Sequence, residues 1–397
     1  MPSVESGSQL RESRRLAAVQ TPVIPVVGRW IAETPGTISL GQGVVSYPPP
    51  PEVAEAVQRF GGSLADHRYG PVEGLPALVD AIERKLAAEN GIIVRPSSRV
   101  VVTAGGNLAF MNAVLAITDP GDEVILLVPY YFNHEMAVVI AGARPVTVAT
   151  SDDYQIDVEA IARAITPRTR AVVTVSPNNP TGAVYSKDAL SAVNALCRER
   201  GVFHVHDEAY EYFVYDGAPH FSPGSLAGAG AHTISLYSLS KAYGMASWRV
   251  GYMVAPESLW SAINKIQDTL LICAPAVSQH AAVAALGVGR RYAAEQLESL
   301  AGVRRLVFDA LSDSHVPCDV PPAGGAFYYF LRVPSTMTPI ALVERLIREH
   351  RVAAMPGSAF GDERTCSLRI SYGALDRASV GEGIARLAAG LRALVRA

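Results

Sequence analysis

Short apolar runs alternate with segments of helical periodicity through the middle of this 397-residue chain. Apolar residues recur at helical spacing in segments such as 108–117 and 187–200. Strands that are apolar along their whole length must be covered on both faces, so the alternation predicts a parallel or mixed sheet between layers of helices. The runs that read as strands are 100–102, 123–128, 145–149, 171–175, 202–205, 233–237 and 249–254.

The rhythm changes in the last third of the chain. Residues 257–312 read as long helix, and Pro22, Pro25 and Pro35 near the N-terminus predict extended or irregular chain. The elements expected after the long helix are strands at 326–333 and 367–371 and helices at 339–350 and 378–395. We therefore expect an α/β fold with a large domain and a smaller α+β domain. The expected parts are an N-terminal arm joining the small domain (1–45), the large domain (46–290) and the small domain (291–397).

Composition excludes several classes of partner. The formal net charge of -3 argues against nucleic acid or an anionic membrane surface, and no apolar run approaches the length of about 20 residues that spans a bilayer. The N-terminus lacks the apolar stretch of a secretion signal. Four cysteines show no metal-binding spacing and are typical of reduced thiols, so we expect a cytoplasmic protein. They are Cys197, Cys273, Cys318 and Cys366.

One lysine points most directly to chemistry. Lys241 ends the segment Ser-Leu-Ser-Lys after an apolar run, and Arg249 follows eight residues later. A lysine amine can form a Schiff base and is a better nucleophile when its pKa is lowered. The arginine fork can hold a phosphate by two parallel hydrogen bonds. The pair predicts a site for a covalently held cofactor that carries a phosphate.

Two further segments follow predicted strands, at the edge where open α/β sheets bind ligands. Gly106 and Asn107 open a helix whose backbone N–H groups would attract a phosphate, although glycine pairs also form ordinary turns. Tyr131 offers a ring that could stack on a flat cofactor, and the alternative is a tyrosine of the core or rim.

Three polar positions could complete such a site. Asn179 lies in an Asn-Pro turn, where its amide could donate to a phenolate-like oxygen or serve the turn alone. Asp207 ends a buried strand, so its carboxylate needs a cation such as a protonated ring nitrogen, unless it caps the next helix. Tyr210 follows within reach of the same ligand. Arg369, in the apolar strand 367–371, suits a carboxylate if it faces a cavity and otherwise faces solvent.

The order of these segments resembles the fold-type I pyridoxal-phosphate enzymes, specifically the class I and II aminotransferases. The resemblance covers about residues 38–374, and its most specific motifs are Asn-Asn-Pro-Thr-Gly at 178–182 and Ser-Leu-Ser-Lys…Trp-Arg-Val-Gly-Tyr at 238–252. It implies a mostly parallel seven-stranded sheet covered by helices and a smaller α+β domain. It also implies bound pyridoxal 5'-phosphate and a ping-pong transfer of the amino group from an amino acid to a 2-oxo acid.

The resemblance also implies a role for each site residue. Lys241 holds the cofactor as a Schiff base and then moves protons, Asp207 keeps the ring nitrogen protonated, and Tyr210 bonds the phenolic oxygen of the ring. The further cofactor-binding residues are Gly106, Asn107, Tyr131, Asn179, Ser238, Ser240 and Arg249. The substrate-binding residues are Gly43, Asn179 and Arg369, with Arg369 on the α-carboxylate.

Tyr69 resembles the tyrosine that reaches the cofactor phosphate of a neighbouring subunit, which implies a homodimer with shared sites. Residues 44–47 depart from the Glu/Phe-Pro-Asp-Phe sequence common in the family, which leaves the side-chain preference open. In the loop 271–275, Cys273 stands where aspartate-preferring members carry an arginine. We expect an amino acid with a neutral, aromatic or sulfur-containing side chain.

Two other functions use similar sequences. β- or γ-elimination and diversion of the carbanion to oxygen need the same residues, so fold and site do not exclude them. Aminotransferase-like domains also act as sensors in transcription regulators, but about 37 residues precede the resemblance, too few for a DNA-binding domain. His204 and His206 have no third ligand at zinc spacing, so no metal is expected, and His206 reads as a polar neighbour of Asp207.

Overall fold

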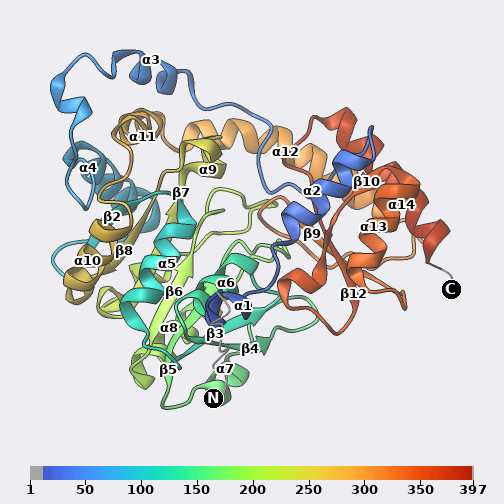
Figure 1. The fold of residues 1–397 in the computed structure, drawn as a ribbon, viewed down its shortest axis with the longest axis horizontal. Helices are drawn as coiled ribbons and strands as arrows, with labels where there is room; N and C mark the ends of the chain where they lie inside the picture. The colour runs from blue at the N-terminus through green and yellow to red at the C-terminus, as the bar shows by residue number, and fades with distance from the viewer. Residues whose placement is uncertain (1–11, 396–397) are drawn as a thin grey trace, which may run out of the picture.

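The computed structural model describes residues 12–395, and its strands form sheets of seven, three and two strands (Figure 1). The large sheet has the order β2-β8-β7-β6-β5-β3-β4, with β8 antiparallel to both neighbours and the other pairs parallel. Each strand overlaps a run predicted from the sequence, so the mostly parallel α/β sheet is confirmed. The strands are β2 (Ser98–Thr103), β3 (Glu123–Val128), β4 (Arg144–Ala149), β5 (Thr169–Val175), β6 (Phe203–Asp207), β7 (Thr233–Ser238) and β8 (Gly251–Pro256).

Both faces of the large sheet are buried except at the edge strand β4, as the apolar runs require. Side chains alternate along each strand, so Val101 packs in one apolar cluster while Val100 and Val102 pack in the other. Burying one such side chain completely contributes about 1.5–3 kcal/mol. One cluster is closed by α5 (Gly106–Ile117), α6 (Phe132–Ile140) and α10 (Trp260–Leu270). The other is closed by α4 (Pro76–Lys85), α8 (Lys187–Arg200) and α11 (Ala276–Val288).

The C-terminal elements form a second layered unit after the long helix α12 (Arg290–Leu311). Its sheet has the antiparallel order β11-β12-β9 and packs against one helix, and a second helix packs beside the first. The predicted strands and helices of this region are all present. They are β9 (Tyr328–Val333), β11 (Met355–Pro356), β12 (Cys366–Ser371), α13 (Pro339–His350) and α14 (Arg377–Leu394).

The N-terminal segment is built into this C-terminal unit. β1 (Ile38–Ser39) pairs in parallel with β10 (Val352–Ala353), and α2 (Val23–Glu33) packs on α13. In Figure 1, α2 in blue accordingly lies among the red C-terminal elements. The chain therefore brings residues from both ends together beside the large sheet.

Two predictions about helices were wrong. The segment with Pro22 and Pro25 is helical, because Pro22 precedes α2 and Pro25 lies in its first turn, where backbone N–H groups need no partner within the helix. Residues 257–312 are three helices, since Pro275 precedes α11 and Gly289 takes a φ of 71° before α12. The remaining α-helices are α1 (Arg14–Ala17), α3 (Pro51–Arg59), α7 (Val158–Ala164) and α9 (Leu239–Ala242). No helix within residues 12–395 combines the length and apolarity needed to cross a membrane.

Candidate active site

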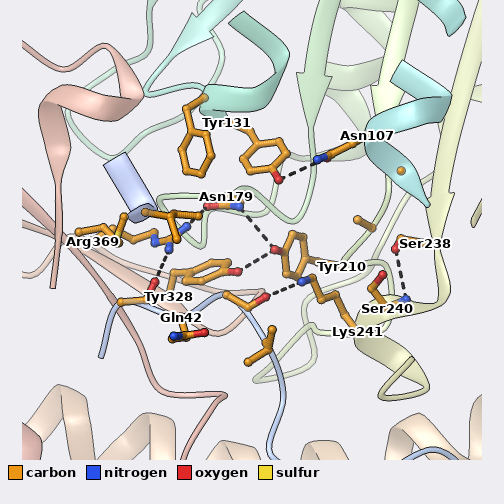
Figure 2. Close-up of a pocket in the computed structure, with 18 of the residues that line it drawn as sticks. Gln42, Asn107, Tyr131, Asn179, Tyr210, Ser238, Ser240, Lys241, Tyr328 and Arg369 are labelled. Carbon is orange, nitrogen blue, oxygen red and sulfur yellow. Dashed lines mark hydrogen bonds between the residues drawn. The ribbon is translucent and has the colours of Figure 1, made fainter. Parts of the chain in front are cut away.

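A cavity of about 300 Å³ opens between the large sheet, the C-terminal unit and α2 (Figure 2). Its volume is that of a pocket for a small ligand. All the predicted site residues except Tyr69 line it. They are Gly43, Gly106, Asn107, Tyr131, Asn179, Asp207, Tyr210, Ser238, Ser240, Lys241, Arg249 and Arg369.

Arg249 lines one corner of the cavity, and Gly105 lies against its guanidinium. Gly105 precedes α5 with a φ of 84°, a conformation that favours glycine. A Cβ atom on Gly105 would lie 2.5 Å from Nη2 of Arg249, so only glycine lets the guanidinium approach this closely. The guanidinium donates to the carbonyl oxygens of Ala104 at 3.3 Å and Ala246 at 2.9 Å and remains exposed. A ligand that enters the cavity can therefore still reach the guanidinium of Arg249.

The same corner gathers donors suited to an anion. Gly106 and Asn107 begin α5, a 12-residue helix whose first N–H groups lack partners within the helix. Ser238 ends β7, and its hydroxyl oxygen accepts a hydrogen bond from the backbone of Ser240 at 3.2 Å. Hydroxyl, backbone and guanidinium donors thus converge from three separate elements.

Lys241 lies on α9, directly after Ser240. Its amine donates a hydrogen bond to the carbonyl oxygen of Gly43, and its own carbonyl accepts one from the hydroxyl of Tyr47 at 2.8 Å. The pKa of Lys241 is lowered to about 8. Burial is the largest cause, the positive charges of Arg369 and Arg249 also lower the pKa, and the negative charge of Asp207 opposes them. The amine therefore has a substantial neutral fraction near neutral pH.

Asp207 ends β6 and is held from two sides. One carboxylate oxygen accepts from the backbone of Ala209 at 2.9 Å, and the other lies 3.1 Å from Nε2 of His134. No helix follows directly, so the alternative role of Asp207 as a helix cap is wrong. His134 is buried and stacks on Phe110 with ring centres 3.9 Å apart. The carboxylate is thus fixed in orientation within the cavity.

His206 does not provide the support for Asp207 that the sequence suggested. Its Nδ1 lies 2.6 Å from the hydroxyl of Thr174, which also contacts His204 at 2.7 Å. Burial lowers the pKa of His206 to about 3, so the ring is neutral. The histidine that contacts Asp207 comes instead from α6, three residues after Tyr131.

Arg369 is buried and faces the cavity, so the alternative of a solvent-facing side chain is wrong. Only 3% of Arg369 is exposed. Its guanidinium donates to Oδ1 of Asn179 at 2.9 Å and to the carbonyl oxygen of Gly41 at 2.7 Å, while its Nε has no partner among residues 12–395. The amide of Asn179 in turn donates to the hydroxyl oxygen of Tyr210 at 3.4 Å. The guanidinium and the phenol are therefore linked through one asparagine.

Tyr131 lines the cavity beside Asn107, as Figure 2 shows. Its hydroxyl donates to Oδ1 of Asn107 at 3.3 Å and accepts from Asn133 at 2.8 Å. The ring meets His134 edge-on, with centres 5.1 Å apart. Tyr131 is therefore a wall of the cavity and is held at both ends.

Tyr69 is the one predicted site residue that the fold does not bring to the cavity. It is 80% exposed and lies ahead of α4, outside the cavity lining. Leu64, in the preceding turn, is 69% exposed. The two side chains present apolar surface on the outside of the described chain.

Comparison with known proteins gives this geometry a family. The sequence model described as "Aminotransferase class I and II" matches residues 35–387. The chain belongs to the class I and II aminotransferases. It is 34% identical over 392 residues to the aromatic aminotransferase ISS1 of Arabidopsis thaliana, covering 96% of this chain and 97% of that protein. It is also 34% identical to the aspartate aminotransferase of Pyrococcus abyssi, covering 84% and 87%.

Solved structures agree with the aminotransferase fold. The aspartate aminotransferase of Thermus thermophilus with maleate superposes with a TM-score of 0.86 at 33% identity, covering 96% of this chain and all of that one. The aromatic aminotransferase of Pyrococcus horikoshii superposes with a TM-score of 0.84 at 32% identity, covering 92% and 99%. The fold is therefore that of the fold-type I aminotransferases.

Several residues that line the aminotransferase cavity, or contact the side chains that line it, were not predicted from the sequence. Tyr328 lies in a run that reads only as a strand, and His134 lies at the start of an apolar helix. The residues of α2 were not predicted to line a cavity, because irregular chain was expected in that segment. The cavity-lining residues that α2 supplies are Ile24, Val27, Gly28 and Ile31.

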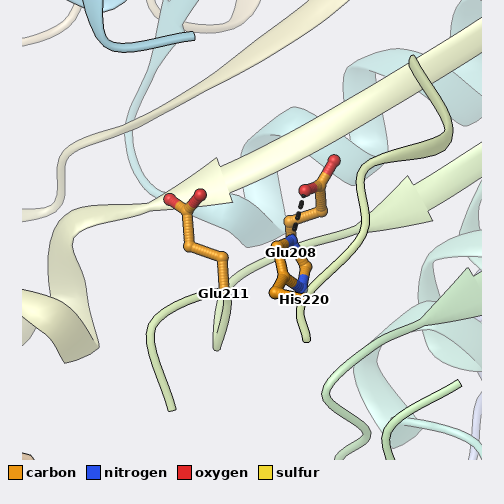
Figure 3. Close-up of side chains that lie close together, drawn as sticks. All are labelled: Glu208, Glu211 and His220. Atoms are coloured by element: carbon orange, nitrogen blue, oxygen red, sulfur yellow. Dashed lines mark hydrogen bonds and ion pairs between the residues drawn. The ribbon is translucent and has the colours of Figure 1, made fainter. Parts of the chain in front are cut away.

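Behind Asp207 lies a polar cluster of Glu208, Glu211 and His220, whose ligand atoms are close enough to hold a metal (Figure 3). These groups already have partners in the aminotransferase. Glu211 contacts the ammonium of Lys85 at 2.5 Å, and Glu208 accepts from Tyr237 at 2.7 Å and contacts His220 at 2.8 Å. The cluster anchors the turn that carries Asp207 and Tyr210, and we assign no metal to it.

Proposed function

We propose that this aminotransferase binds pyridoxal 5'-phosphate on Lys241 and transfers the amino group of an amino acid to a 2-oxo acid by a ping-pong mechanism. The observation that carries the proposal is a lysine amine with a pKa lowered to about 8 in one cavity with Asp207, Arg249 and Arg369. A nucleophilic amine, a carboxylate and two separate anion sites are what this cofactor and an amino acid require.

The residues present fit the cofactor. The corner of Gly106, Ser238 and Arg249 offers donors for a phosphate, and the glycine at 105 keeps that corner open. Asp207 gives a protonated ring nitrogen a buried partner, and Tyr210 lies across the cavity as a phenol whose pKa burial raises far above neutrality. The further members of the proposed cofactor site are Asn107, Tyr131, Asn179 and Ser240.

When bound, pyridoxal phosphate supplies an aldehyde that condenses with amines and a protonated ring that withdraws electrons. The residues of the chain do the rest. Asp207 holds the proton on the ring nitrogen, and Tyr210 with Asn179 donates to the phenolic oxygen. Arg369 binds the substrate α-carboxylate beside the backbone of Gly43. Lys241, once released by the substrate, would take the proton from the α-carbon and would return it to the former aldehyde carbon of the cofactor.

The preferred substrate has a neutral, aromatic or sulfur-containing side chain. Within residues 12–395, the basic side chains of the cavity are Lys241, Arg249 and Arg369, and each already has a role in the proposal. The face of α2 that lines the cavity is apolar and includes Ile24 and Ile31. A second carboxylate would find no cation of this chain there, and its desolvation would be costly. The relatives include aromatic and aspartate aminotransferases, so the proposed preference rests on the lining of the cavity.

The active unit is a homodimer in which Tyr69 of each subunit completes the other subunit's phosphate corner. The exposure of Tyr69 and Leu64 supports this arrangement, because a second subunit placed on this surface would bury both apolar side chains. The test is a mixture of Lys241→Ala and Tyr69→Phe chains. Hybrid dimers should contain one unaltered site and recover activity, whereas absence of recovery in verified hybrids contradicts sharing.

Covalent trapping tests the proposed function directly. Borohydride reduction of the cofactor-loaded protein should attach one cofactor to the peptide that contains Lys241, as read by mass spectrometry. Lys241→Ala should lose this adduct and remain folded, while Lys265→Ala, at an exposed lysine on α10, should keep it. A specific adduct on another lysine would contradict the assignment. The products distinguish transamination from the rival eliminations and oxidations, because only transamination consumes a 2-oxo acid.

A further inference from the structure

Tyr328 contacts two groups of the cavity that have different proposed roles. Its hydroxyl oxygen lies 2.7 Å from that of Tyr210, and the guanidinium carbon of Arg369 lies 4.6 Å from the centre of its ring. Figure 2 shows Tyr328 between these two side chains. It lines the cavity and is fully buried. One side chain thus links the proposed partner of the cofactor oxygen to the proposed partner of the substrate carboxylate.

The Tyr210–Tyr328 contact uses only one of the two phenol hydrogens. Each phenol has one hydrogen to donate, and among residues 12–395 neither hydroxyl donates to any other group. If Tyr328 donates, the oxygen of Tyr210 accepts from both Tyr328 and Asn179, and the hydrogen of Tyr210 points into the cavity. If Tyr210 donates, its hydrogen is used within the protein. The direction of this hydrogen bond decides whether Tyr210 can donate its hydrogen to a ligand.

The surroundings of Tyr328 favour it as the donor. The positive charge of Arg369 lies over its ring and makes its hydroxyl the stronger acid. Burial raises the pKa of Tyr328 to about 12, with Arg369 opposing the rise, and burial together with the neighbouring phenol also raises the pKa of Tyr210. The more acidic hydroxyl is the better donor.

Packing keeps Tyr328 in this orientation. A Cβ atom on Gly43 would lie 2.7 Å from the hydroxyl oxygen of Tyr328, so the backbone at Gly43 closes over that hydroxyl. On its other side Arg369 contacts the ring of Phe360, with the guanidinium carbon 5.0 Å from the ring centre. The guanidinium therefore lies against two aromatic rings, which limits its motion.

We propose that Tyr328 is a positioning residue with two separable parts. Its hydroxyl donates to Tyr210, which leaves the Tyr210 hydrogen for the phenolic oxygen of pyridoxal phosphate. Its ring holds the Arg369 guanidinium in place for the substrate carboxylate. The proposal rests on the proposed function, because the bound cofactor supplies the acceptor for Tyr210.

The hydroxyl is tested by Tyr328→Phe in the cofactor-loaded enzyme. Loss of the donor weakens donation by Tyr210, so the pKa read from the visible absorbance of the lysine-bound cofactor should rise by about 0.5–1 unit. The matched control is Tyr329→Phe, the next residue on β9, whose hydroxyl lies 3.5 Å from the carbonyl oxygen of Arg304 and outside the cavity. It should leave the titration unchanged. An unchanged or lowered pKa in Tyr328→Phe overturns the proposed donor.

The ring is tested by comparing Tyr328→Phe with Tyr328→Leu. The probe is 3-phenylpropionate, a carboxylate without an amine, titrated into the loaded enzyme by calorimetry. Tyr328→Phe should bind it as the unaltered protein does, and Tyr328→Leu should bind about tenfold more weakly, since it loses the ring over Arg369. Equal affinities in all three proteins contradict the role of the ring. Failure of the unaltered protein to develop the visible band would instead count against the proposed function.

Discussion

The amine of Lys241 donates a hydrogen bond to the carbonyl oxygen of Gly43, 198 residues earlier in the chain. The contact joins α9, which directly follows β7 of the large sheet, to the N-terminal segment. That segment also contains β1, which pairs with β10 of the C-terminal unit. Tyr47 strengthens the same junction through the carbonyl of Lys241. The reactive amine is therefore placed by contacts between two distant parts of the chain, and its environment sets its pKa.

Attachment of the cofactor to the cofactor-free protein should depend on pH through Lys241. A pKa of about 8 leaves roughly 10% of the amine neutral at pH 7, against roughly 0.03% for a lysine at 10.5. The attachment rate should rise with pH and reach half its maximum near pH 8. Arg369→Leu removes a positive charge and should move that midpoint upward, whereas Arg345→Leu on the surface should not. A midpoint near 10.5 in the unaltered protein would show that the cavity does not perturb the amine.

Gly105→Ala should weaken cofactor binding. The added Cβ atom would lie 2.5 Å from Nη2 of Arg249 and push the guanidinium out of the phosphate corner. Gly121→Ala is the matched control, because Gly121 has a similar φ of 91° and open space around its Cβ position. Both variants bear the backbone strain of a positive φ. Equilibrium dialysis should show a cofactor Kd raised about tenfold or more only in Gly105→Ala. Equal losses would attribute the effect to strain alone.

Arg369→Lys should raise the KM of the amino acid about 10- to 100-fold, because an ammonium cannot form the two parallel bonds of a guanidinium to a carboxylate. Amines that lack the carboxylate should react with the variant and the unaltered enzyme at similar rates. Steady-state and single-turnover kinetics with an amino acid and its decarboxylated analogue separate the two cases. Equal rate losses for both substrates would place Arg369 outside carboxylate recognition.

His134→Phe should reduce kcat about 10- to 100-fold while keeping the ring that stacks on Phe110. The change removes the nitrogen that lies 3.1 Å from the Asp207 carboxylate, and with it the contact that helps to fix the orientation of that carboxylate. Asp207→Asn should cost more, since it removes the charge itself. His315→Phe, at an exposed histidine, serves as the control. A kcat unchanged in His134→Phe would remove His134 from the support of Asp207.

Local patterns predicted much of the fold and site because short-range physics determines them. The buried strands are apolar throughout, and the residues that follow their carboxyl ends reach one edge of the sheet. Lys241, Asp207 and Asn179 could therefore be placed in one cavity from the sequence. The family resemblance added the pairing of Arg369 with this cavity.

The remaining features depend on contacts that no local pattern contains. Tyr328 is one of several aromatic residues in an ordinary strand, and its neighbours Tyr210 and Arg369 come from distant segments. His134 reaches Asp207 because α6 packs against α5, where Phe110 stacks on the His134 ring. The helix α2 was missed because its prolines were read as breakers, although a proline in the first turn of a helix removes no helical hydrogen bond.

The most direct test of amino-group transfer is a single half-reaction. The cofactor-loaded enzyme is mixed with phenylalanine or methionine in the absence of any 2-oxo acid. We predict loss of the visible band, about one equivalent of the corresponding 2-oxo acid per subunit and no free ammonia, with the band restored when a different 2-oxo acid is added. Continued release of ammonia without an acceptor, in amounts equal to the oxo acid formed, would contradict transamination and favour elimination or oxidation on the same site.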